Sequence, residues 1–231
     1  MKVGGLNFKG NNQAIIFKTK HMAAIGLLLS GATLFLNSLV LLNKADAKSA
    51  SLLNIFVGTL QVVIPFYLLM TIGDGKWELF NTGSIFFFGL TYLYNGFTNL
   101  KDFNGTGLGW FSLWVSIMSV LYAFVNFVVI HDVVNGLLWV MWAYLWYLFF
   151  AGLVLGKKIE RYTGIVAMIQ SWTTITIPAF FMIIGLWEDA AILNAWCVVL
   201  GAAILYFIIH EIKSFVKNKR FQLYNRPELK N

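Results

Sequence analysis

A stripe of tryptophans is the feature of this sequence that is most suited to contact a ligand. It lies in the apolar run from Leu137 to Phe150, where Trp139, Trp142 and Trp146 recur at intervals of three and four residues. In an α-helix this spacing places the three indole rings on one face. A buried indole needs a hydrogen-bond acceptor for its N–H group. The stripe therefore either packs in a helical core or lines a lumen, where the N–H groups can meet a passing solute, and the spacing leaves both interpretations open.

The depth of these tryptophans is unusual for a membrane protein. Tryptophan usually lies at the membrane interface, and Trp77, Trp110 and Trp187 fit that rule because they stand at the ends of apolar runs. Trp142 and Trp146 stand near the middle of theirs. A second aromatic pair, Phe88 and Tyr92, is spaced four residues apart and so stacks on one side of another helix.

Composition predicts an all-α polytopic membrane protein. The chain has 231 residues, of which 59% are hydrophobic and 12% charged, and its mean hydropathy is +0.73. The apolar residues come in runs close to the roughly 20 residues that cross a bilayer. We expect seven spans, at Met22–Leu42, Leu52–Ile72, Gly83–Asn99, Gly109–Ile130, Val134–Leu155, Thr163–Trp187 and Ala190–Ile209.

Charge is absent from these spans, which contain no Asp, Glu, Lys or Arg. Proton relays and ion-coupled transporters need ionisable groups at depth, and a retinal protein needs a lysine in its last span, so these classes are excluded. His21, His131 and His210 lie at span ends, and Cys197 is the only cysteine. We therefore expect no catalytic centre, metal site, cofactor or disulfide, and the net charge of +7 lies between spans rather than marking a nucleic-acid surface.

The polar residues that remain inside the spans are neutral. Such residues often form hydrogen bonds between helices, each worth about 1 kcal/mol or less. As a set without charge, they also suit a narrow path for a small neutral solute, which needs donors and acceptors but no counter-charge. The set comprises Asn37, Asn54, Gln61, Asn95, Asn126, Gln170, Thr173, Thr174 and Thr176, together with several tyrosines.

Lysine and arginine are distributed unequally between the two sides of the predicted bundle. Five lie on the side of the N-terminus. Twelve lie on the other side, and six of these twelve are in the tail from Lys213 to Lys230. The positive-inside rule then places the N-terminus outside and the C-terminus in the cytoplasm.

Several stretches of the sequence together resemble one family, the bacterial urea channels and short-chain amide transporters (UreI/AmiS). The resemblance covers roughly Met22 to Trp187. The matching stretches are KADAKS (44–49), NIFVG (54–58), FGLTYLY (88–94), WFSL (110–113), WVMWAYLW (139–146) and IPA (177–179).

The resemblance implies a six-helix channel bundle that forms a homo-hexamer around a lipid plug in the bacterial plasma membrane, with the N-terminus outside. It makes Trp142 and Trp146 the paired indoles of a constriction, with Leu145 beside them and Trp139 one turn further out. Other residues that it assigns to the lining are Phe88, Tyr92, Leu27, Ser30 and Leu34, and the family's sixth-span glutamate falls on Gln170.

The chain departs from the family pattern at both ends and in its outer loops. We expect an N-terminal extension at 1–21, the channel bundle at 22–187, an additional span at 188–210 and a basic cytoplasmic tail at 211–231. In the second outer loop only His131 and Asp132 could sense pH, and histidine is the side chain that titrates near pH 6. Strong acid gating is therefore not expected.

Two functions from different classes fit the sequence. The first is a passive channel for urea or a small aliphatic amide, functionally linked to a cytoplasmic urease or amidase. Its mechanism assigns the indole N–H groups, the Tyr92 hydroxyl and Gln170 to replace the water that a solute loses. The second is a non-transporting membrane scaffold or sensor whose basic tail holds a partner or membrane lipids. Whether urea or acetamide is the solute is left open.

Overall fold

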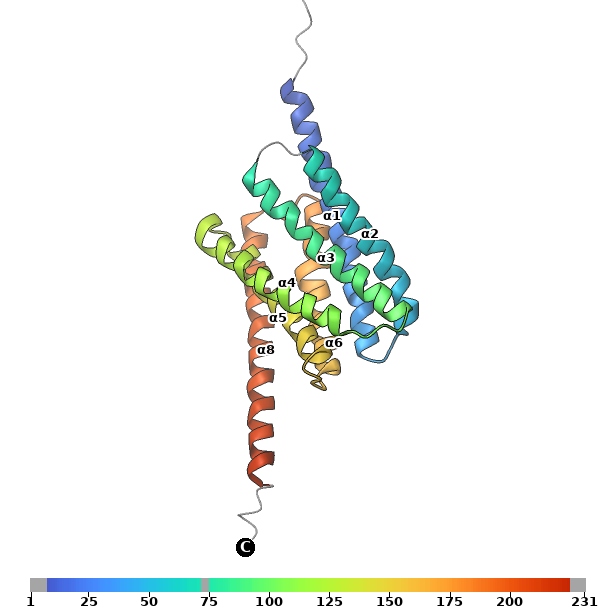
Figure 1. The fold of residues 1–231 in the computed structure, drawn as a ribbon. Helices are drawn as coiled ribbons and strands as arrows, with labels where there is room; N and C mark the ends of the chain where they lie inside the picture. The colour runs from blue at the N-terminus through green and yellow to red at the C-terminus, as the bar shows by residue number, and fades with distance from the viewer. Residues whose placement is uncertain (1–7, 72–74, 225–231) are drawn as a thin grey trace, which may run out of the picture.

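A computed structural model describes residues 8–71 and 75–224, and every regular element in these ranges is helical, as composition predicts. Figure 1 shows the helices as a bundle with one long helix at its side. In chain order they are α1 (Phe8–Leu41), α2 (Ala47–Thr71), α3 (Lys76–Leu100), α4 (Thr106–Val125), the π-helical turn η1 (Asn126–Ile130), α5 (Val133–Leu153), α6 (Glu160–Gln170), the π-helical segment η2 (Ser171–Thr176), α7 (Ile177–Ile183) and α8 (Ala190–Tyr224).

Six stretches of the described residues are long and apolar enough to cross a membrane, whereas seven spans were predicted. Helix α3 is not among them, because glycine, threonine and asparagine repeatedly interrupt its apolar residues. The chain is therefore a multi-pass membrane protein with six candidate spans. They are Met22–Leu41, Ala47–Thr71, Thr106–Ile130, Val133–Leu153, Glu160–Ile183 and Ala190–Ser214.

The outer surface of the bundle is apolar, as a lipid environment requires. Phe56 is 66% exposed, Met70 83% and Val198 72%. In water, patches of this kind mark a site of association. On helices of membrane-spanning length they are the surface that contacts acyl chains.

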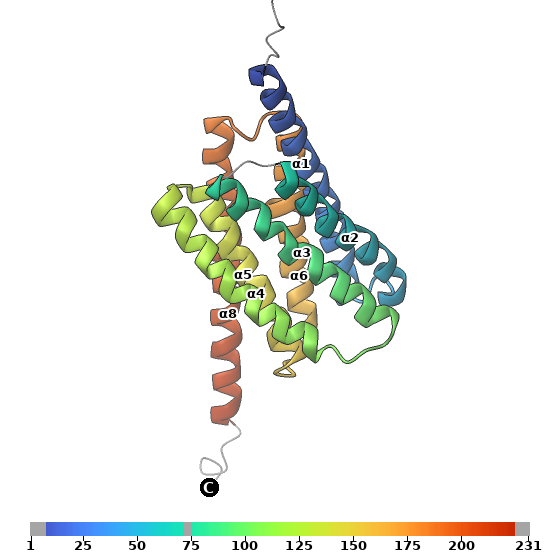
Figure 2. The ribbon, with the colours of Figure 1, turned by 45° about the horizontal axis from the view of Figure 1, so that its top comes forward.

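Helices α4 and α5 form an antiparallel hairpin, as the short connection at His131-Asp132 predicts (Figure 2). The chain reverses at His131, whose φ of 60° lies in the left-handed region. The carboxylate of Asp132 then accepts a hydrogen bond from the backbone N–H of Asn135 at 2.9 Å and so caps the start of α5. Across the hairpin, the Ser116 hydroxyl donates to the carbonyl of Ala143 at 2.8 Å.

Helices α2 and α3 approach each other closely at glycines. A Cβ atom added to Gly58 would lie 2.7 Å from the backbone nitrogen of Leu93, and one added to Gly89 would lie 2.8 Å from the carbonyl carbon of Gln61. Small residues permit such contacts between membrane helices. Because Phe88 is next to Gly89, this packing fixes the position of Phe88 along the axis of the bundle.

Helix α8 lies against α5 and the α6–η2–α7 span through a stripe of buried side chains. Trp196, Leu200 and Phe207 are each at most 9% exposed. The Trp196 indole donates to the carbonyl of Thr173 in η2 at 2.8 Å, and the Tyr144 hydroxyl donates to Glu211 at 2.8 Å. Helix α8 is therefore attached to α5, which carries the tryptophan stripe, and to η2.

The helices at both ends of the chain run across the predicted segment boundaries, and the division into segments stays a prediction. Helix α1 begins at Phe8, so the boundary expected at residue 22 lies within a helix. Helix α8 likewise continues past the boundary expected at residue 211 to Tyr224. Of the predicted N-terminal extension and basic tail, residues 1–7 and 225–231 lie outside the described part of the chain.

Candidate functional site

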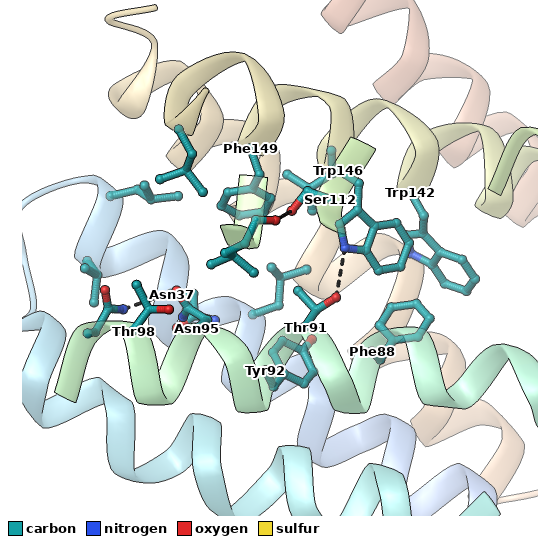
Figure 3. A pocket seen from close by; sticks show the side chains of 17 residues that line it. Asn37, Phe88, Thr91, Tyr92, Asn95, Thr98, Ser112, Trp142, Trp146 and Phe149 are labelled. Carbon is teal, nitrogen blue, oxygen red and sulfur yellow. Dashed lines mark hydrogen bonds between the residues drawn. The ribbon is translucent and has the colours of Figure 1, made fainter. Parts of the chain in front are cut away.

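A cavity of about 190 Å³ lies between α1, α3, α4 and α5. It runs from Phe88, near the middle of α3, to the helix ends at Leu41, Asn99 and Leu153. Figure 3 shows the rings of Phe88, Trp142 and Trp146 at one end, and the side chains of Asn37, Asn95 and Thr98 at the other. The lining residues are Leu34, Asn37, Val40, Leu41, Phe88, Thr91, Tyr92, Asn95, Thr98, Asn99, Leu108, Ser112, Trp142, Leu145, Trp146, Phe149 and Leu153.

An aromatic layer closes the inner end of the cavity. The Phe88 ring centroid lies 4.9 Å from that of Trp142, nearly perpendicular to it, and 5.0 Å from that of Trp146. All three side chains are at most 9% exposed. Two helices that are distant in sequence therefore bring their aromatic faces together, as the spacing on each helix allows.

The aromatic contacts continue beyond this layer, away from the cavity. Trp139 lies 4.8 Å from Trp142 and 4.4 Å from Tyr122, measured between ring centroids. Tyr122 in turn stacks on Phe80 at 4.1 Å, and its hydroxyl donates to the Phe80 carbonyl at 2.9 Å. A continuous column of rings thus extends from the cavity toward the opposite side of the bundle.

Threonine hydroxyls accept the two indole N–H groups. Trp142 donates to Thr174 of η2 at 2.9 Å, and Trp146 donates to Thr91 of α3 at 3.2 Å. Each threonine hydroxyl in turn donates a hydrogen bond to the carbonyl four residues earlier in its helix, at 2.7 and 2.6 Å. Whether the stripe lines a path for a solute stays a prediction. The N–H groups are satisfied within the protein, while the rings line the cavity.

The lining of the cavity carries no charged side chain. Tyr92 is the only lining residue with a titratable group, and its hydroxyl donates to the Ser30 carbonyl of α1 at 3.0 Å. Within the described ranges, no group of three or more His, Cys, Asp or Glu residues is placed to hold a metal ion. The arrangement can accept a neutral polar molecule and offers no counter-charge to an ion.

Comparison with known proteins identifies the family of this chain. The model of the AmiS/UreI family of transporters matches residues 22–186. The chain belongs to the AmiS/UreI transporter family. The resemblance seen in the sequence motifs is thereby confirmed, and the family is one of transporters and channels rather than enzymes.

Curated relatives and a solved structure agree with this assignment. The chain is 43% identical to the transporter protein named AmiS2 of Rhodococcus erythropolis over 165 residues, which are 71% of this chain and 80% of that protein. It is 37% identical to a protein of Mycolicibacterium smegmatis named as an amidate substrates transporter, over 79% of this chain and 86% of that protein. The cryoEM structure of the Helicobacter pylori urea channel in its closed state matches with a TM-score of 0.65 and 25% identity, and covers 71% of this chain and 99% of that one.

Six of the ten residues that the resemblance assigns to the lining of this transporter lie on the cavity. They come from three helices, and their part in solute passage stays a prediction. They are Leu34 of α1, Phe88 and Tyr92 of α3, and Trp142, Leu145 and Trp146 of α5.

The other four lie outside the cavity lining. Leu27 is partly buried and packs against the hydrophobic core. Ser30 is fully buried and its hydroxyl accepts a hydrogen bond from Gln61. Trp139 belongs to the column of rings beyond the aromatic layer. Gln170 is fully buried, and its amide nitrogen donates to the carbonyl of Met141 at 2.8 Å.

Most of the polar groups expected to meet the solute are therefore occupied within the transporter, but the Gln170 side-chain oxygen has no hydrogen-bond partner among the described residues. The indole N–H groups bond threonines, the Tyr92 hydroxyl bonds a backbone carbonyl, and the Gln170 nitrogen bonds another. Sequence reasoning missed the polar residues at the far end of the cavity, chiefly Thr98 and Asn99. A signal for them exists, because Asn95, Thr98 and Asn99 are spaced three and four residues apart and share one helical face.

His131 and Asp132, the residues considered for pH sensing, lie at the α4–α5 turn. The cavity reaches the opposite ends of these two helices. The His131 side chain is exposed, and the Asp132 carboxylate accepts from the backbone and side-chain nitrogens of Asn135 at 2.9 and 2.7 Å. Neither residue contributes to the lining.

Proposed function

We propose that this transporter is a passive channel for urea or a small aliphatic amide. The observation that carries the proposal is an uncharged cavity that ends on a layer formed by Phe88, Trp142 and Trp146. In the proposed passage a flat neutral solute crosses this layer of rings, whereas an ion would lose its hydration without compensation. The relatives named for amide transport and for urea support the same two solute types.

The proposed topology has seven spans, with α3 added to the six candidates. Its support is the close packing of α3 on α2 and its place in the bundle between α2 and α4 (Figures 1 and 2). The proposed location is a bacterial plasma membrane, with the N-terminus outside and the C-terminus in the cytoplasm. The cavity then opens on the cytoplasmic side, where Lys44 and Lys101 lie in the neighbouring loops. The proposed assembly is a homo-hexamer, and the proposed functional partner is a cytoplasmic urease or amidase.

The first prediction concerns solute selectivity. Purified protein in liposomes is expected to accelerate entry of radiolabelled urea or acetamide at least several-fold over empty liposomes. Entry of acetate, which carries a charge on a similar skeleton, is expected to stay at the background rate because the cavity offers no counter-charge. Tracer uptake by filtration measures all three rates. Protein that inserts correctly and accelerates neither amide would instead favour the membrane scaffold or sensor.

The second prediction concerns pH. Uptake is expected to change only weakly between pH 5 and 7, since the cavity lining contains no histidine and no carboxylate. His131 is exposed at the other end of the bundle, and His210 of α8 stacks on Tyr162 outside the cavity. Uptake at pH 5, 6 and 7, with the same pH on both sides of the membrane, measures the dependence. A sharp opening on acidification would refute the expectation.

A further inference from the structure

Four asparagines form a hydrogen-bonded cluster at the end of the cavity away from the aromatic layer. The side chains of Asn37 of α1 and Asn54 of α2 donate to each other's oxygen at 2.9 and 2.7 Å. Asn95 of α3 donates to Asn54 at 3.1 Å, and Asn99 donates to Asn95 at 3.2 Å. The cluster joins three helices where the cavity approaches their ends.

Asn54 is the saturated centre of this cluster. It is fully buried, and its second N–H donates to the carbonyl of Ala50 at 2.9 Å. Its oxygen accepts from both Asn37 and Asn95, so both N–H groups and both lone pairs are used. Asn54 does not line the cavity and therefore holds the other two amides in position from behind.

Asn37 and Asn95 line the cavity with capacity to spare. Each of them donates one N–H to the oxygen of Asn54. The oxygen of Asn37 accepts one hydrogen bond from Asn54, and the oxygen of Asn95 accepts one from Asn99. A carboxamide has two N–H groups and two lone pairs. Among the described residues, each of the two side chains therefore keeps one donor and one acceptor that no protein group uses.

Thr98 adds a buried hydroxyl without a partner. Its side chain is 6% exposed and lines the cavity, and its oxygen has no hydrogen-bond partner among the described residues. Thr91 and Ser112, which line the same cavity, donate to carbonyls four residues earlier at 2.6 and 2.8 Å. A buried polar group without a partner is costly. Figure 3 shows Thr98 beside Asn37 and Asn95, at the opposite end from Trp142.

We infer that Asn37, Asn95 and Thr98 form a binding subsite for a primary carboxamide group. The solute's carbonyl oxygen accepts from the Thr98 hydroxyl, and its NH₂ group donates to the free lone pairs of the asparagine oxygens. The cavity has the room, because its about 190 Å³ is more than ten times the about 10–15 Å³ that one water molecule needs.

The subsite supplies hydrogen bonds that the aromatic layer does not offer to a solute. An amide that enters the layer must lose its water, which is unfavourable unless other hydrogen bonds replace it. The asparagine cluster supplies these bonds immediately before the rings. The subsite would therefore select neutral solutes that carry the H₂N–C=O group over neutral solutes that do not. This inference rests on the proposed function.

The experiment that tests the subsite uses Thr98→Val, which removes the hydroxyl at nearly constant volume. The full-length protein is reconstituted in liposomes, and acetamide entry is measured as a function of acetamide concentration. The half-saturating concentration is expected to rise about two- to tenfold, the change expected for the loss of one hydrogen bond. Thr98→Ser keeps the hydroxyl and is expected to retain the wild-type value.

Thr59→Val is the matched control, because Thr59 is exposed on α2 and bonds only its own helix at 2.8 Å. The thermal unfolding midpoint provides a second readout in each variant. Thr98→Val breaks no hydrogen bond among the described residues, so its midpoint without solute is expected to be unchanged or higher. Acetamide is expected to raise the midpoint of the wild type more than that of Thr98→Val.

The outcomes separate the subsite from the proposed function. If wild-type protein transports acetamide without saturation, or if Thr98→Val saturates as the wild type does, the subsite is refuted and the channel stands. If wild-type protein transports neither amide, the channel is refuted. In that case an acetamide-dependent rise in midpoint that Thr98→Val abolishes still supports the subsite, and an equal rise in both proteins overturns it.

Discussion

Replacing Trp142 with alanine is expected to change urea and acetamide flux at least several-fold and to admit glycerol, and Trp146→Ala is expected to do the same. The Trp142 ring contacts Phe88 at 4.9 Å and Trp139 at 4.8 Å, so its removal opens the aromatic layer between cavity and column. Water can then enter the space that the indole ring filled. A solute then no longer has to lose its water to cross the layer, so the selection of amides over glycerol is lost.

The measurement is tracer uptake into proteoliposomes, with the amount of folded protein determined for each variant. Folding must be checked because removal of a buried tryptophan costs about 3–5 kcal/mol of stability. Trp110→Ala is the control, since this tryptophan of α4 is 58% exposed and lies outside the cavity. Unchanged flux in both Trp142→Ala and Trp146→Ala, with folding intact, would remove these residues from the pathway.

Gly58→Ala is expected to lower the unfolding free energy by about 1–3 kcal/mol, the usual cost of overpacking. The added methyl group would lie 2.7 Å from the backbone nitrogen of Leu93 and 2.9 Å from the carbonyl oxygen of Gly89. Neither atom can rotate away, so α2 and α3 must separate. Phe88 moves with α3, and the flux of solute is expected to fall as well.

Gly201→Ala provides the same chemical change where there is space. Gly201 is an exposed position of α8, and no heavy atom of the described residues lies within 4 Å of an added Cβ. Its stability is expected to be unchanged or slightly raised, because alanine favours a helix over glycine by about 0.5–1 kcal/mol. Detergent-induced unfolding of both variants measures the difference. Equal stabilities would contradict the glycine contact as the basis of α2–α3 packing.

Much of the fold followed from local pattern. The apolar runs predicted helices because a chain without water must satisfy its backbone hydrogen bonds within each segment. The ends were less predictable, because α1 and α8 continue into the polar residues at either end, where hydropathy carries no signal for a helix. Helix α3 falls short of a candidate span chiefly because its asparagines, with threonines and glycines, lower its hydropathy.

The candidate site was predictable where it depends on one helix. The spacing of Trp142 and Trp146 placed both rings on one face, and the uncharged spans predicted a neutral solute. The partners of those rings were not predictable in the same way. Thr174 lies 32 residues from Trp142 and Thr91 lies 55 residues from Trp146, and such pairings depend on the register of one helix against another.

The asparagines illustrate the same division. Their presence within apolar runs is visible in the sequence, and hydrogen bonding between helices was the ordinary interpretation. The tertiary structure alone decides that Asn54 uses all its hydrogen-bonding capacity while Asn37 and Asn95 keep some for the cavity. The sequence by itself determined the class of protein, its family and the face that carries the rings. Which polar groups remain free for a solute was decided by helix packing, because each amide or hydroxyl is satisfied or left open by residues of other helices.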